Sequence, residues 1–137
     1  MESVEELESQ MLAVFQVDSV QRSAMSTLAQ FGVDLAMVDR VKSRNGLGSS
    51  QELANQNEAA IEAILDQLAA HNSPAAVQVI QRTFKSKLLP YRSLALRALA
   101  QMSIPEARRA IVKRKSWFSS ASPEEKRLAE QLLDLKS

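Results

Sequence analysis

Apolar residues along the chain recur at intervals of three and four positions, which is the spacing of an amphipathic α-helix. The first apolar stripe follows Ser3, which stands before a glutamate at the spacing of a capping box. Asp18 is predicted to cap a second helix that ends near Gly32, and Asp34 to cap a third that ends before Asn45. The N-terminal third therefore reads as three short helices.

The rest of the chain is divided by the same kinds of signal. Ser49 is predicted to open a long helix, and Ser73 precedes a proline at a first helical position. Pro90, Pro105 and Pro123 mark the starts of the last three helices. The pattern thus predicts eight helices joined mostly by connections of a few residues, and short connections favour antiparallel neighbours.

Comparison of the chain with itself indicates an internal repeat. A shift of 34 residues aligns Leu94 with Leu128 and Leu99 with Leu133. A shift of 31 residues aligns Pro74 with Pro105 and Ile80 with Ile111. The two shifts differ by the length of a loop, where insertions have a small free-energy cost.

The stretch YRSLALRALAQMSIPEARRAIV, which begins at Tyr91, is the clearest of these units. It resembles the HEAT-like repeats, especially the short kind found in bilin lyases, through Arg92, the pair Ala98-Leu99 and the run 105–107, Pro-Glu-Ala. Tyr91 stands where such units usually have Val. The resemblance covers residues 58–135, and it implies stacked helical hairpins whose second helices line a concave face.

We therefore predict an all-α fold in which a three-helix N-terminal subdomain, residues 1–46, precedes a short HEAT-like α-solenoid of stacked helical hairpins, residues 47–137. The segment NGLGSS between them holds two of the three glycines and is predicted to be a joint. One hairpin cannot bury its apolar stripe alone, so hairpins must stack. The residues predicted to form the seam are Leu94, Ala95, Ala98, Leu99, Met102, Ala107, Ala110 and Ile111.

The composition agrees with this predicted fold and adds information on charge and localisation. The net charge is +1, but residues 1–74 hold four basic and eleven acidic residues, whereas residues 75–137 hold thirteen and five. This asymmetry is consistent with mutual attraction of the two halves, with steering of an acidic partner, or with a head-to-tail homodimer. The acidic N-terminus does not resemble a secretory signal, and no apolar run could span a bilayer. A cytoplasmic protein that does not use a membrane is expected.

Candidate catalytic groups are scarce. The chain has no cysteine and one histidine, His71, at a predicted helix end, where a favourable interaction with the helix dipole explains it. NGLGSS does not match a glycine-rich phosphate loop. We therefore predict no enzymatic activity, no cofactor and no metal site.

The helix predicted from Pro105 has two unlike sides. Ala107, Ala110, Ile111 and Arg114 share one side, and cations occupy the other. In a HEAT-like stack that second side would line the concave face, and a tryptophan beside cations is a plausible binding hot spot or base-stacking platform. A solvated charged face with a packed tryptophan is the simpler alternative. The candidate partner-binding residues are Arg82, Arg108, Arg109, Lys113, Lys115 and Trp117.

Residues 24–43 also resemble a helix-turn-helix pair. Gly32 stands at the turn, and Val38 and Val41 have the spacing that would pack the second helix. Asp34 and Asp39 on that helix would repel phosphate, which counts against reading of DNA.

The function predicted from these features is a non-catalytic protein–protein interaction module, an adaptor, scaffold or regulatory subunit, that binds an acidic partner surface through a basic helical face. The alternative is nucleic-acid binding through the basic C-terminal half or the helix-turn-helix-like pair. A bilin lyase or chaperone role is a third hypothesis, implied by the family resemblance alone.

Overall fold

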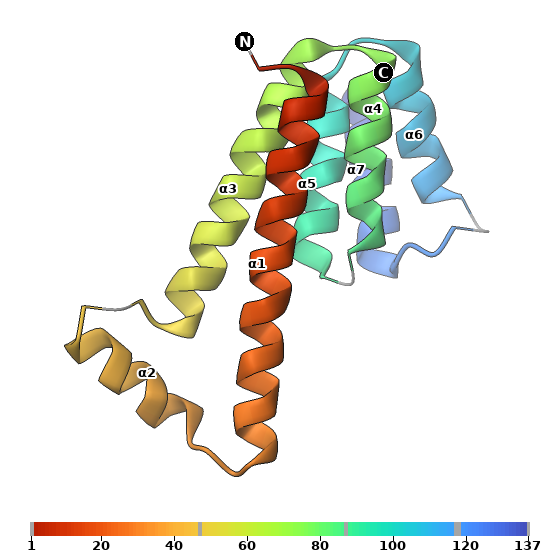
Figure 1. The fold of residues 1–137 in the computed structure, drawn as a ribbon. Coiled ribbons are helices and arrows are strands. Elements are labelled where there is room, and N and C mark those ends of the chain that lie inside the picture. Colours follow the sequence, from red (N-terminus) through yellow and green to blue (C-terminus); the bar gives the residue numbers. More distant parts are fainter. Residues whose placement is uncertain (1, 47, 87, 117–118, 137) are drawn as a thin grey trace. The chain divides into compact units, whose positions relative to one another are not determined.

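The computed structural model describes residues 2–46, 48–86, 88–116 and 119–136, and over these ranges the chain is helical with no strand (Figure 1). The all-α prediction is confirmed. The described elements are α1 (Val4–Gln30), α2 (Leu35–Arg44), α3 (Ser50–His71), α4 (Pro74–Arg82), the 3₁₀ turn η1 (Thr83–Lys85), α5 (Leu89–Gln101), α6 (Pro105–Lys115) and α7 (Pro123–Lys136).

The first two predicted helices are one continuous helix, α1, so the expected cap at Asp18 is wrong. Asp18 is buried, and its carboxylate accepts hydrogen bonds from Arg22 Nε at 2.8 Å and Asn57 Nδ2 at 3.1 Å. Because these side chains satisfy the carboxylate, it does not compete for the backbone amides of the following turn. Two helices, rather than the predicted three, therefore lie within the described residues 2–46.

The chain divides into two compact units. The first unit contains residues 1–8 and 62–137, and the second contains residues 9–61. The boundaries between the units fall inside α1 and inside α3. Division into a subdomain of residues 1–46 and a repeat region of residues 47–137 remains a prediction.

In the first unit, α4 packs on α5 and α6, and α5, α6 and α7 pack on one another. The connection between α5 and α6 is three residues long, and Pro105 is the first residue of α6, as predicted. Leu94 is only half-buried, but the other predicted seam residues are buried. The largest fully buried apolar side chains of this unit are Leu7, Leu65, Leu68, Ile80, Tyr91, Leu96, Leu99, Met102 and Ile111.

Two hydrogen bonds connect the turn after α3 to the turn after α5. Asn72 has a positive φ of 50°, and its side-chain oxygen accepts from the Ser103 backbone N–H at 3.0 Å. Its amide nitrogen donates to Ser103 Oγ at 2.7 Å. These residues are 31 positions apart, which is the shift that aligns α4 with α6 in the sequence. Positions that are equivalent in the predicted repeat thus contact each other.

The second unit has a sparser interior. Among its described residues only Met11, Asp18 and Ile61 are buried, and α2 has no buried residue. Asp39 of α2 accepts hydrogen bonds from Ser50 N at 3.1 Å and Ser50 Oγ at 2.9 Å, which fixes α2 to the start of α3. Many large apolar side chains of this unit are exposed: Leu12, Val17, Val20, Phe31, Val33, Met37 and Val41. None of the helices described is both long enough and apolar enough to cross a membrane.

Candidate functional site

A shallow groove runs between α4 and α6 in the first unit, where these helices lie side by side (Figure 1). It consists of two adjoining hollows of about 240 and 270 Å³. Both hollows share Gln81, Ala110 and Lys113. The first is completed by Pro74, Val77, Gln78, Glu106 and Arg109, and the second by Phe84, Arg114, Ser119 and Ser120.

The two walls of the groove differ in chemistry. Gln78 and Gln81 present neutral amides from α4, whereas Arg109 and Lys113, one helical turn apart on α6, present cations. Arg109 Nη2 lies 3.6 Å from Glu106 Oε1, and both side chains are exposed enough that water screens this pair. In the described part of the chain Lys113 forms no ion pair. The groove is therefore cationic along one edge.

The structure separates the other predicted binding residues from this pair. Arg82 Nη1 forms an ion pair with Glu8 Oε2 near the start of the chain. Arg108 is exposed on α6 and lines neither hollow. Lys115 Nζ lies 4.0 Å from Glu130 Oε1 of α7. Trp117 lies outside the described residues.

A buried charge cluster lies beneath the end of the groove, and sequence analysis did not detect it. Glu125 of α7 is 0% exposed and forms ion pairs with two arginines. Arg92 Nε of α5 lies 2.8 Å from its Oε1, and Arg114 Nε and Nη2 of α6 both lie 2.7 Å from its Oε2. The sequence placed Arg114 on the same side of α6 as Ala107, Ala110 and Ile111, and all four residues are buried. The cluster ties together the three C-terminal helices.

Local contacts complete this cluster. The Arg114 guanidinium stacks on the Phe84 ring with 4.6 Å between its carbon and the ring centroid, a favourable cation–π geometry. Ser122 and Glu125 form a reciprocal capping box at the start of α7, in which Glu125 N donates to Ser122 Oγ and Ser122 N donates to Glu125 Oε1, both at 3.3 Å. The same carboxylate thus caps α7 and neutralises buried cations, which fixes the orientation of the basic helix α6.

The single histidine of the sequence contacts the backbone near the N-terminus. His71 Nε2 lies 2.6 Å from the backbone carbonyl oxygen of Glu2. No group of three acidic or histidine side chains able to hold a metal occurs among the residues that the structure describes.

The helix-turn-helix-like segment has the expected turn but not the expected packing. Gly32 has a φ of 75°, and Asp34 caps α2 by accepting from Ala36 N at 3.0 Å. Val41 is 51% exposed, so its predicted inward position is wrong. With no buried residue on α2, the second helix lacks the packing on the first that holds a recognition helix in place.

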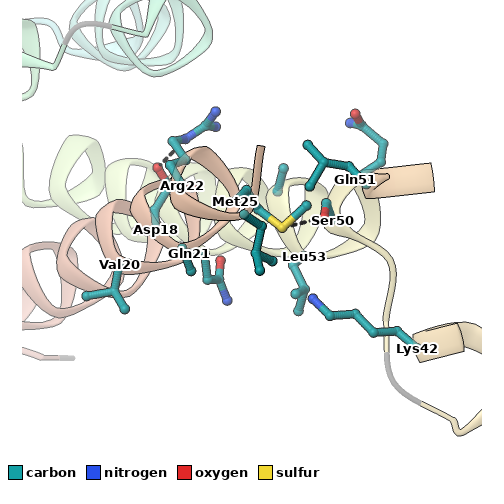
Figure 2. Close-up of a pocket in the computed structure, with 13 residues that line it drawn as sticks. Asp18, Val20, Gln21, Arg22, Met25, Lys42, Ser50, Gln51 and Leu53 are labelled. Atoms are coloured by element: carbon teal, nitrogen blue, oxygen red, sulfur yellow. Dashed lines mark hydrogen bonds and ion pairs between the residues drawn. The ribbon is translucent and has the colours of Figure 1, made fainter. Parts of the chain in front are cut away.

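A cavity of about 630 Å³ lies in the second unit among α1, α2 and α3 (Figure 2). Its wall is mainly apolar and includes Met25, Leu28, Leu35 and Leu53. Periodicity alone did not predict this cleft, because it depends on the distance between the three helices rather than on any one stripe.

Comparison of the chain with models of protein families, with curated proteins and with solved structures finds no match. The functional conclusions below therefore rest on the residues and geometry described above.

Proposed function

We propose that this protein is a non-catalytic interaction module that binds an acidic segment of a partner protein in the groove between α4 and α6. The observation that carries this proposal is the placement of Arg109 and Lys113 on one edge of a hollow whose opposite wall holds Gln78 and Gln81. Cations on one wall can attract carboxylates, while amides on the other can donate and accept hydrogen bonds with a peptide backbone.

The buried contacts that hold α6 in place favour a preformed binding site. α6 is held from below by Arg114 in the buried cluster and by the buried residues Ala107 and Ile111. A rigid surface loses little conformational freedom when a partner binds, so more of the contact free energy contributes to affinity. In this proposal the helices form a short HEAT-like stack, and the contact between Asn72 and Ser103 is the observation that supports it.

The test is capture from an extract of the organism that encodes the chain, followed by quantitative mass spectrometry. The double variant Arg109→Glu/Lys113→Glu should lose the acidic partners retained by the wild type, because reversal of two charges replaces attraction by repulsion. We expect a depletion of about tenfold or more, since like-charge juxtaposition costs several kcal/mol.

The matched control is Arg97→Glu/Arg127→Glu, which reverses two exposed cations of α5 and α7 that line neither hollow. This variant should retain the partners. An identical set of proteins bound to wild type and both variants would contradict the proposal. Nuclease treatment before capture distinguishes the nucleic-acid alternative, because partners held through RNA or DNA would then disappear from the wild-type sample as well.

A further inference from the structure

The cleft of the second unit has the size and lining of a small-molecule site. Its volume of about 630 Å³ is within the range of roughly 300–1,000 Å³ typical of ligand pockets. The apolar wall is contributed by all three helices: Val20, Ala24, Met25, Leu28, Leu35, Leu53 and Ala54. Such a surface favours an apolar ligand body, because contact removes apolar area from water.

Most polar side chains around the cleft already have partners. Asp18 accepts from Arg22 at 2.8 Å, and Gln21 Oε1 accepts from Asn57 Nδ2 at 2.9 Å. Ser50 Oγ donates to Asp39, and Gln51 Nε2 donates to Asn55 Oδ1 at 2.9 Å. These groups do not require a ligand.

Lys42 is the exception. It lines the cleft from α2, it is half-buried, and it forms no ion pair with the residues that the structure describes. Figure 2 shows its side chain extending from α2 toward the region of Leu53. Asp39, the acid nearest along α2, accepts both hydrogen bonds from Ser50. A half-buried ammonium beside an apolar wall favours an anion that can approach it from the cleft.

We propose that this cleft binds an amphiphilic carboxylate, a ligand with an apolar chain and one anionic head. The chain would lie against Met25, Leu28 and Leu53, and the carboxylate would pair with the Lys42 ammonium. Burial of the chain would supply most of the affinity, since each buried methylene raises it about fourfold. The ion pair would orient the ligand and discriminate against a neutral head.

Isothermal titration calorimetry of the full chain with decanoate and with nonanol tests the proposal, because the two probes share a nine-carbon alkyl chain and differ in the charge of the head. The wild type should bind decanoate about two- to fivefold more tightly than nonanol, the range for a solvent-accessible ion pair. Lys42→Gln should abolish this preference. The matched control Arg44→Gln removes an exposed cation of α2 that does not line the cleft and should preserve it.

A second pair of variants tests whether the chain of the ligand occupies the cleft. Leu28→Gln places a polar group in the wall and should weaken decanoate binding about tenfold, whereas Met37→Gln alters an exposed residue outside the cleft and should have no effect. Circular dichroism of each variant checks that its helical content is unchanged. The proposal is overturned if decanoate fails to bind, if nonanol binds equally well, or if Met37→Gln weakens binding as much as Leu28→Gln, which would indicate adsorption to the exposed apolar surface.

Discussion

Glu125→Gln is expected to lower the free energy of unfolding by about 3–5 kcal/mol, the range for breaking a buried ion pair by removal of one partner. Glu125 is fully buried and faces both Arg92 and Arg114. The amide keeps the volume of the carboxylate but leaves the buried Arg114 and the partly buried Arg92 without this counter-charge. Desolvation of those cations, which the carboxylate offsets in the wild type, then acts against folding.

Urea denaturation followed by far-ultraviolet circular dichroism measures this effect. Glu124→Gln provides the matched control, since Glu124 precedes Glu125 in the first turn of α7 but is exposed. It should change stability by about 0.5 kcal/mol or less. Equal stabilities of the two variants would show that the buried cluster does not hold α7 in place.

Leu99→Ala is expected to cost about 2–5 kcal/mol, the range for large-to-small substitution in a core. Leu99 is 0% exposed on α5, the helix that packs on α4, α6 and α7. The substitution removes three carbon atoms from a fully buried site, so its cost combines the lost burial of those atoms with the cavity that they leave.

Thermal unfolding monitored by circular dichroism, together with urea titration, compares the stability of Leu99→Ala with that of the wild type. Leu135→Ala removes the same atoms from a residue of α7 that is 83% exposed, and it should leave stability almost unchanged. A loss below about 1 kcal/mol for Leu99→Ala would mean that α5 is not central to the core of the first unit.

Sequence signals for helix starts proved informative because capping is local. Ser3, Ser49 and Ser73 each accept a hydrogen bond from the backbone N–H three residues later, at 3.1–3.2 Å, as the spacing predicts. The predicted helix cap at Asp18 is wrong for a related reason. The same carboxylate can cap a new helix or pair with an arginine one turn ahead, and the choice depends partly on Asn57, which is remote in sequence.

Features that depend on contacts between residues far apart in the sequence could be predicted only in part. The helical period places Arg114 on the inner side of α6, but it does not identify Glu125 as the partner, because that requires the path of the chain into α7. The repeat places Arg82 at the position that corresponds to Lys113, whereas the contact of Arg82 with Glu8 joins residues 74 positions apart. The cleft around Met25 likewise depends on where α2 lies within the second unit.

The central claim is that the groove between α4 and α6 binds acidic segments, and amide chemical-shift mapping tests it most directly. The isotope-labelled chain would be titrated with a glutamate-rich peptide and with a glutamine-rich peptide of equal length. We expect shifts concentrated at Gln78, Gln81, Arg109 and Lys113 with the glutamate peptide only. Equal shifts with both peptides, or shifts confined to residues outside α4 and α6, would contradict the claim.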